Sequence, residues 1–363
     1  MNKAKRGIAR YFVTAAIAMG SAAVIVAAIP DGQWLAWGQQ TALLSIGLRQ
    51  PEGSAQLLEE WVQGEPAGAL STTDSTSMSV QFSPVESKAT AVTTTTGTVA
   101  VPTGGGRVLT QQLSSGSSFI QGVAINNKSG KTADIAAALR RVPALSFDKA
   151  SSQPQVLITH THTTECYLQQ DNGVYRADDA TRTHDTTKNV VAVGNAVAAQ
   201  LRQAGIGVIH DTVIHDEPYN GAYNHSKAEV ERLLKQYPTI RVVLDIHRDA
   251  IYPSDTTRVK PTAVIDGKKA AQVMIIVGMK NTTAVPNKHV QENLAFGVRL
   301  QQYLHTTYTG LMRPLLLADA RYNQHLTNGS LLIEMGSDAN TTAEAMYSGE
   351  LVGKGLAQVL RNL

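Results

Sequence analysis

From Gln155 to the C-terminus, short apolar runs alternate with longer amphipathic stretches. The runs at 156–158, 240–246, 273–277 and 331–333 have the length and composition of buried strands. The stretches between them carry apolar residues at helical spacing. This alternation predicts an α/β fold with a mostly parallel central sheet and helices on both faces.

The ends of several expected helices can be read from the sequence. A helix is predicted over 189–204, where apolar residues recur every three or four positions. Ser226 and Glu229 have the spacing of a capping box, and so do Thr341 and Glu344. We therefore expect one helix to begin at Ser226 and the last helix to begin at Thr341.

The N-terminal segment has the features of a membrane anchor. Residues 11–29 carry no charge and are about as long as a helix that crosses a bilayer. Four basic residues precede them, which places the N-terminus in the cytoplasm. A cleaved signal peptide is the alternative, although its apolar region is usually shorter. We expect a retained single-pass anchor in the cell membrane, with the rest of the chain on the extracytoplasmic side.

Composition divides the chain into three parts. Residues 1–30 form the cytoplasmic tip and the transmembrane anchor. Ser, Thr, Ala and Gly dominate 64–106, where too little apolar surface is available to offset the loss of chain entropy on folding. We therefore expect a disordered, low-complexity extracytoplasmic tether over 31–107 and a catalytic domain over 108–363.

Charge and cysteine content exclude several classes of protein. Apart from the basic N-terminal tip, acidic and basic residues nearly balance, so we expect no nucleic-acid partner. The single cysteine, Cys166, rules out an intrachain disulfide, a Cys-rich zinc finger and an iron–sulfur cluster. The sequence also lacks the motifs of serine hydrolases, P-loop enzymes and Rossmann dehydrogenases.

Polar residues with catalytic chemistry mark the ends of three expected strands. His162 and Glu165 follow the first strand, His247 follows the second, and Glu334 follows the last. Ligands bind at the carboxyl ends of strands in open α/β sheets. We therefore expect these four side chains to converge.

Two histidines and one glutamate form the ligand set of a catalytic zinc ion that keeps an open position for water. We predict a Zn²⁺ site made by His162, Glu165 and His247. Glu334 is then the residue that takes a proton from water and passes it to the leaving amine. The order of these residues resembles that of zinc carboxypeptidases in pattern only.

Some assignments stay open at this point. His160 is an alternative to His162, because residues two apart on a strand share a face. Asp185 is an alternative to Glu165. A lone strand-end histidine is more often structural than a ligand, and seven histidines have no strand-end context: His184, His210, His215, His225, His289, His305 and His325.

Two further residues near His247 have expected roles. Asp245 has the position of a partner that orients a ligand histidine. Arg248 is placed in the catalytic set, where its guanidinium would pair with a substrate carboxylate; pairing with Asp249 is the alternative.

Five motifs lie in the same order as in the stage II sporulation protein P family, which this chain resembles. This family contains membrane-anchored cell-wall hydrolases of endospore-forming bacteria. The resemblance covers about 122–363. Its motifs are His160-Thr-His162-Thr-Thr-Glu165, Asn189-Val-Val-Ala-Val-Gly194, Asp245-Ile-His247-Arg248-Asp249-Ala250, Arg321-Tyr-Asn323-Gln, and Leu332-Ile-Glu334-Met-Gly-Ser337 followed by Asn340-Thr.

The resemblance implies a zinc-dependent N-acetylmuramoyl-L-alanine amidase that acts on peptidoglycan and also cleaves peptide crosslinks. It implies the fold of the amidase-3-like zinc hydrolases and a role in engulfment during sporulation. The implied partners are a lytic transglycosylase and a membrane protein, and Glu334 matches the late catalytic glutamate. A stem-peptide carboxypeptidase or endopeptidase, and an inactive wall-binding module, are the rival functions.

Overall fold

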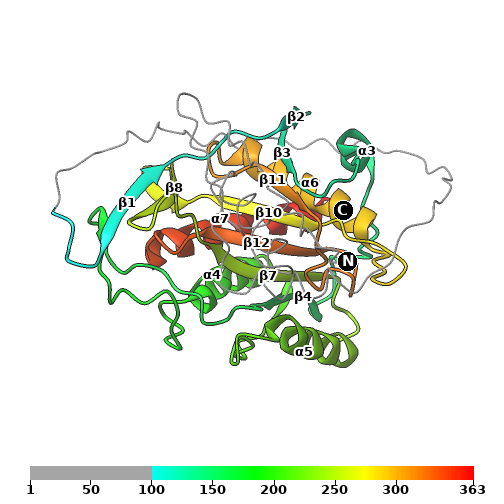
Figure 1. Ribbon diagram of the computed structural model, residues 1–363. Coiled ribbons are helices and arrows are strands. Elements are labelled where there is room, and N and C mark those ends of the chain that lie inside the picture. Colours follow the sequence, from blue (N-terminus) through cyan, green and yellow to red (C-terminus); the bar gives the residue numbers. More distant parts are fainter. Residues whose placement is uncertain (1–99) are drawn as a thin grey trace, which may run out of the picture. The chain divides into compact units, whose positions relative to one another are not determined.

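The structure is a computed structural model that describes residues 100–363 (Figure 1). The predicted membrane span at 11–29 and most of the predicted tether lie outside the described residues and stay predictions. Within the described part, no helix is both long and apolar enough to cross a bilayer. The first strand, β1 (Gly106–Gln111), begins close to the expected start of the catalytic domain.

An eight-stranded central sheet has the order β2-β3-β11-β10-β12-β7-β4-β6 (Figure 1). Apolar runs in the sequence predicted four of these strands, β4, β7, β10 and β12. The eight strands are β2 (Ser118–Ile120), β3 (Val123–Asn127), β4 (Pro154–Thr159), β6 (Gly207–His210), β7 (Val242–Asp249), β10 (Val273–Gly278), β11 (Leu315–Ala318) and β12 (Ser330–Ser337).

The central sheet is mixed, so the prediction of a mostly parallel sheet is wrong. β7 runs parallel to both β4 and β12, as expected. However, β10 is antiparallel to β12, and β2 is antiparallel to β3. The prediction assumed a helical crossover between successive strands, which parallel pairing requires. The chain instead passes from β7 to β10 through a hairpin of β8 (Thr257–Ile265) and β9 (Lys268–Ala271).

This hairpin belongs to a second, four-stranded sheet with the order β5-β1-β8-β9, in which β5 is Val174–Tyr175. The sequence did not predict β8, because polar residues interrupt its apolar pattern. Lys260 of β8 is buried, and its Nζ atom lies 2.5 Å from Asp171 Oδ1 and 3.0 Å from Glu344 Oε1. These two carboxylates neutralise a charge that would otherwise be costly to bury.

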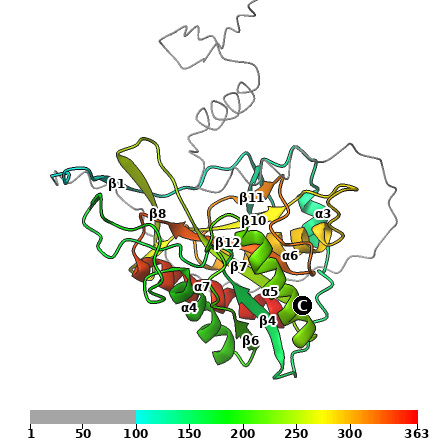
Figure 2. The same ribbon diagram turned by 60° about the horizontal axis from the view of Figure 1, so that its bottom comes forward.

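Helices cover both faces of the central sheet, as predicted. Val156 and Ile158 of β4 pack in the main core with α4 (Val190–Gln203), α6 (Val290–Thr307) and α7 (Thr342–Arg361). Leu157 points to the other face, where it packs against α5 (Ala222–Gln236). Figure 2 brings α5 to the front. A short helix, α3 (Ile135–Arg140), packs on α6.

One of the two predicted capping boxes is present. The Thr341 side chain and Glu344 cap the start of α7 reciprocally. The predicted start of α5 at Ser226 is wrong, because this helix begins at Ala222 after Gly221, whose φ is +97°. Ser226 lies inside the helix, and its hydroxyl is 2.7 Å from that of Thr161. The serine therefore connects α5 to the segment that follows β4.

Candidate active site

Three neighbouring parallel strands bring the four predicted site residues together. His162 and Glu165 lie in the turns directly after β4, whereas His247 lies in β7 and Glu334 in β12. Glu334 is paired in register with His247. Because β4, β7 and β12 run in the same direction, their polar groups meet near the carboxyl ends of these strands. The expected convergence is present in the structure.

His247 connects the two parts of this cluster. Its ring lies 5.3 Å from that of His162, measured between centroids, and the two planes are at 85°. Its Nδ1 atom is 3.5 Å from Glu165 Oε2, and its Nε2 atom is 2.9 Å from Asp245 Oδ1. A buried imidazole therefore lies between two buried carboxylates.

The neighbouring charges determine which of these groups carry a proton. Burial alone would lower the pKa of His247, but the Asp245 and Glu165 carboxylates raise it well above its ordinary value. Burial would raise the pKa of Glu165, but Arg248 and His247 hold it well below its usual range. Burial lowers the pKa of His162 to about 4. One histidine of the pair is therefore cationic at neutral pH and the other is neutral.

Glu334 lies beside the cluster with an unsatisfied carboxyl oxygen. Its Oε2 atom is buried and has no hydrogen-bond partner among residues 100–363. Burial, with a further contribution from the Asp249 carboxylate, raises the pKa of Glu334 to about 8. A carboxyl group with a pKa near neutrality suits a residue that both accepts and donates a proton.

The donor atoms fit a zinc ion in kind. Imidazole nitrogens and a carboxylate are its usual ligands, and His162 Nδ1 is buried without a hydrogen-bond partner in the described region. No group of three His, Cys, Asp or Glu side chains in that region is already arranged around one point. His247 is instead in contact with Glu165 and Asp245. The residues present therefore fit the metal in donor type, and in this arrangement Glu165 and His247 contact each other directly.

Asp245 connects β7 to the start of the β4 turn. Its carboxylate accepts hydrogen bonds from the backbone N–H of Thr161 at 2.8 Å and from the Thr161 hydroxyl at 2.7 Å. The same carboxylate contacts His247. Its role as a partner that orients a site histidine stays a prediction.

Arg248 is buried, and its guanidinium donates hydrogen bonds to two backbone carbonyls, those of Cys166 at 3.2 Å and Thr181 at 2.7 Å. The alternative partner Asp249 lies instead 2.8 Å from Arg313. The backbone N–H of Arg248 donates to Glu165 Oε2 at 3.2 Å. Arg248 thus supports the segment that contains Glu165, and its contact with a substrate carboxylate stays a prediction.

The two alternative ligands have hydrogen-bond partners of their own. Asp185 bonds to Thr187 and Lys188 at the surface. His160 donates a hydrogen bond from Nδ1 to the carbonyl of Ile246 at 2.9 Å, and its Nε2 atom lies 2.9 Å from His210 Nε2. His160 and His162 therefore have different surroundings, although they are two residues apart.

The prediction that His210 has no strand-end context is wrong, because His210 ends β6, the strand next to β4. Its ring and that of His160 are 5.1 Å apart between centroids. Burial lowers the pKa of His160 to about 4 and that of His210 to about 3. Both rings are therefore neutral at physiological pH. The short apolar run at 206–209, directly before His210, was the signal that marked this histidine.

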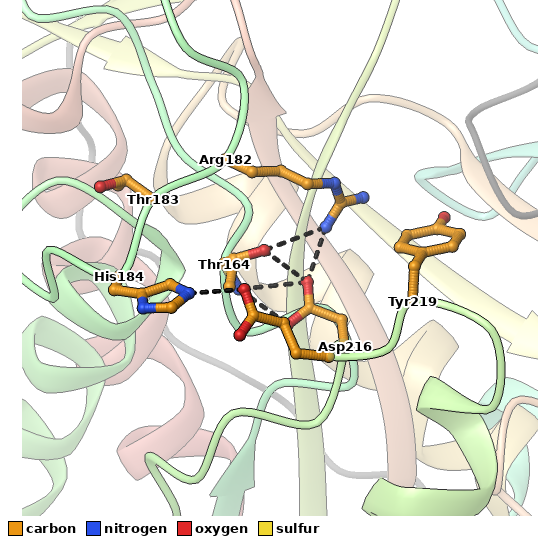
Figure 3. A pocket seen from close by; sticks show the side chains of 7 residues that line it. Thr164, Arg182, Thr183, His184, Asp216 and Tyr219 are labelled. Carbon is orange, nitrogen blue, oxygen red and sulfur yellow. Dashed lines mark hydrogen bonds and ion pairs between the residues drawn. The ribbon is translucent and has the colours of Figure 1, made fainter.

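Sequence reasoning also missed the aromatic side of the site. Tyr219 stacks on the His162 ring at 4.8 Å and 8°, and Tyr223 meets the same ring edge-on at 5.7 Å. Tyr219 also lines a cavity of about 340 Å³, shown in Figure 3. The other lining residues are Thr164, Arg182, Thr183, His184, Asp216 and Glu217. The cavity therefore adjoins the cluster through the Tyr219 ring.

Residues 78–360 match the family profile described as stage II sporulation protein P. The chain belongs to this family. The stage II sporulation protein P of Bacillus subtilis (strain 168) is 31% identical over 201 residues, which are 52% of this chain and 47% of the relative. The chain thus spans about half the length of the curated relative that it matches. All four residues of the cluster lie within the segment that matches the family.

Solved amidase structures resemble this chain only weakly. The CwlD amidase of Clostridioides difficile, solved in complex with the GerS lipoprotein, is 11% identical with a TM-score of 0.37, covering 57% of this chain and 98% of that chain. The N-acetylmuramyl-L-alanine amidase Ami1 of Mycobacterium smegmatis is 12% identical with a TM-score of 0.34, covering 59% and 100%. Likeness at this level transfers neither fold nor function.

Proposed function

We propose that this protein is a zinc-dependent peptidoglycan hydrolase of sporulation, and specifically an N-acetylmuramoyl-L-alanine amidase. The observation that carries the proposal is the convergence of His162, Glu165, His247 and Glu334 at one edge of the sheet. Membership of the stage II sporulation protein P family supports the cellular role. Cleavage of peptide crosslinks is part of the same proposal.

His162, Glu165 and His247 are the residues that would hold the metal. When bound, zinc supplies a Lewis acid that lowers the pKa of water toward about 7. The neutral ring of His162 can donate a lone pair without losing a proton first, because its pKa is lowered to about 4. Asp245 holds His247 in orientation through the contact at 2.9 Å.

Glu334 moves the proton in this proposal. Its carboxylate accepts a proton from the attacking water, and the resulting acid donates that proton to the alanine nitrogen as the amide bond breaks. Burial and the Asp249 carboxylate, which raise its pKa to about 8, favour the protonated form after the first transfer. The same residue therefore serves as base and then as acid.

We also propose the cellular arrangement that the sequence predicts. The span at 11–29 would anchor the chain in the cell membrane, and the tether would let the domain reach the wall on the extracytoplasmic side. A lytic transglycosylase and a membrane protein of engulfment are the proposed partners. Co-purification of either partner from sporulating cells with the full-length chain tests this part.

The reaction is tested by digesting purified peptidoglycan with the full-length protein and identifying the soluble products by mass spectrometry. We expect free stem peptides with an N-terminal alanine, lost with a chelator or in Glu334→Gln and restored by zinc. Asp185→Asn is the matched control, because that carboxylate lies outside the cluster. Products cut only within the peptides would establish an endopeptidase instead. Zinc binding without any product would favour a wall-binding module.

A further inference from the structure

The ring of His162 is held by aromatic contacts. A metal-ligating histidine usually donates its second ring N–H to a carboxylate or carbonyl, which fixes the ring plane. The His162 Nδ1 atom, which is free to bind the metal, has no hydrogen-bond partner in the part of the chain that the structure describes, so no hydrogen bond at this atom fixes the ring. The ring instead stacks on Tyr219, with the two planes only 8° apart and the centroids 4.8 Å apart.

Tyr219 is itself held in place by a charged side chain. The Arg182 guanidinium carbon lies 4.5 Å from the centroid of the Tyr219 ring, a cation–π distance. Arg182 is fixed in turn, because its Nη1 atom donates to Asp216 Oδ2 at 2.6 Å and to the Thr164 hydroxyl at 3.3 Å. Figure 3 shows these bonds beside the Tyr219 ring.

Asp216 ties the Tyr219 loop to the same turn that contains His162. It accepts a hydrogen bond from the Thr164 hydroxyl at 2.6 Å and one from the Thr164 backbone N–H at 3.2 Å. Its side chain is fully buried. The loop that presents Tyr219 and the turn that presents His162 and Glu165 therefore form one connected unit.

We infer that Tyr219 is a positioning residue for His162, whose ring plane it sets by stacking. The inference rests on the proposed function, in which His162 is a zinc ligand. The ring face of Tyr219 provides the effect, so phenylalanine should replace it and a side chain without a ring should not.

The test uses the full-length protein and measures zinc affinity by competition with a chelator. We expect Tyr219→Ala to weaken zinc binding by about 10- to 100-fold, the range for residues that orient a ligand. Tyr219→Phe should bind zinc like the wild type. Phe119→Ala is the control, because Phe119 also contacts a histidine, His305, but edge-on at 6.2 Å between centroids and from an exposed position on β2. Tyr219→Leu provides the same comparison if the alanine variant does not fold.

A second readout needs no metal. In the metal-free protein, the stack should shift the carbon-bound protons of the His162 ring upfield in the NMR spectrum of histidine-labelled protein. The signals are assigned by their loss in His162→Gln, and the shift should disappear in Tyr219→Ala and persist in Tyr219→Phe. If the wild type binds zinc and Tyr219→Ala and Tyr219→Leu bind it with the same affinity, the positioning role is overturned and the proposed function stays intact. A wild type that binds no zinc would overturn both.

Discussion

The Nδ1 atom of His247 lies 3.5 Å from the Oε2 atom of Glu165, and this contact joins β7 to the turn after β4. The second nitrogen of His247 faces Asp245 at 2.9 Å. Together the two carboxylates raise the pKa of His247 well above its ordinary value. In the metal-free protein a proton on His247 therefore provides the positive charge that balances them.

Zinc uptake should release protons. A histidine that binds zinc must be neutral, so His247 loses its proton, and the nearby cation should also lower the pKa of Glu334 from about 8. We expect between about one and two protons at neutral pH, measured by calorimetry in buffers of different ionisation enthalpy. Glu334→Gln should release about one proton fewer when it binds zinc. Zinc binding without proton release would contradict a cationic His247.

Glu334→Gln should stabilise the metal-free protein at alkaline pH. The folded-state pKa of Glu334, about 8, lies above its ordinary value of 4.5, so the folded state of the wild type loses stability as the pH rises between these values. Glutamine does not ionise and avoids this loss. We expect a gain on the order of 2 kcal/mol above pH ~8 and little difference below pH ~5, measured by urea unfolding with a chelator present. A gain that is equal at both pH values would argue against a raised pKa.

The parts of the fold that could be predicted from the sequence are those determined by local apolar pattern. The buried strands β4, β7, β10 and β12 each contain a short apolar run, and Thr341 and Glu344 form their capping box within four residues. The direction of a strand depends on the segment that connects it to the previous strand. The β8–β9 hairpin could not be predicted, because its Lys260 is buried through contacts with Asp171 and Glu344. Asp171 and Glu344 are distant from Lys260 in the sequence, so no local sequence pattern predicts that this lysine is buried.

The site residues could likewise be predicted only where the local sequence marks them. Polar residues at strand ends marked His162, Glu165, His247 and Glu334 correctly as neighbours. Tyr219 could not be found this way, because it lies in a loop and reaches His162 only through tertiary contacts.

Arg248→Lys should destabilise the protein. The guanidinium is buried and satisfies the carbonyls of Cys166 and Thr181 together, and an ammonium group does not reproduce this geometry. We expect a loss of about 2–4 kcal/mol in the free energy of unfolding, with little change in KM. Arg241→Lys is the matched control, because its guanidinium also bonds to backbone carbonyls, but at the surface; it should change stability by less than about 0.5 kcal/mol. A raised KM with unchanged stability would instead favour contact with a substrate carboxylate.

Gly194→Ala should also destabilise the protein, although alanine normally stabilises a helix relative to glycine by about 1 kcal/mol. A Cβ atom at Gly194 in α4 would lie 2.5 Å from His210 Nε2 and 2.7 Å from His160 Nε2. His160 cannot move away easily, since its Nδ1 atom is bonded to the carbonyl of Ile246. We expect a loss of about 1–3 kcal/mol by urea unfolding.

A double-mutant cycle identifies the cause of that loss. His210→Ala removes the nearer ring, so Gly194→Ala should cost less in that background than in the wild type. His160 is present in both backgrounds, so its contact with the new methyl group accounts for the loss of stability that remains in the His210→Ala background. If Gly194→Ala stabilised the wild type, or if its cost were the same in both backgrounds, the close packing of α4 against the two histidines would not be what requires glycine at this position.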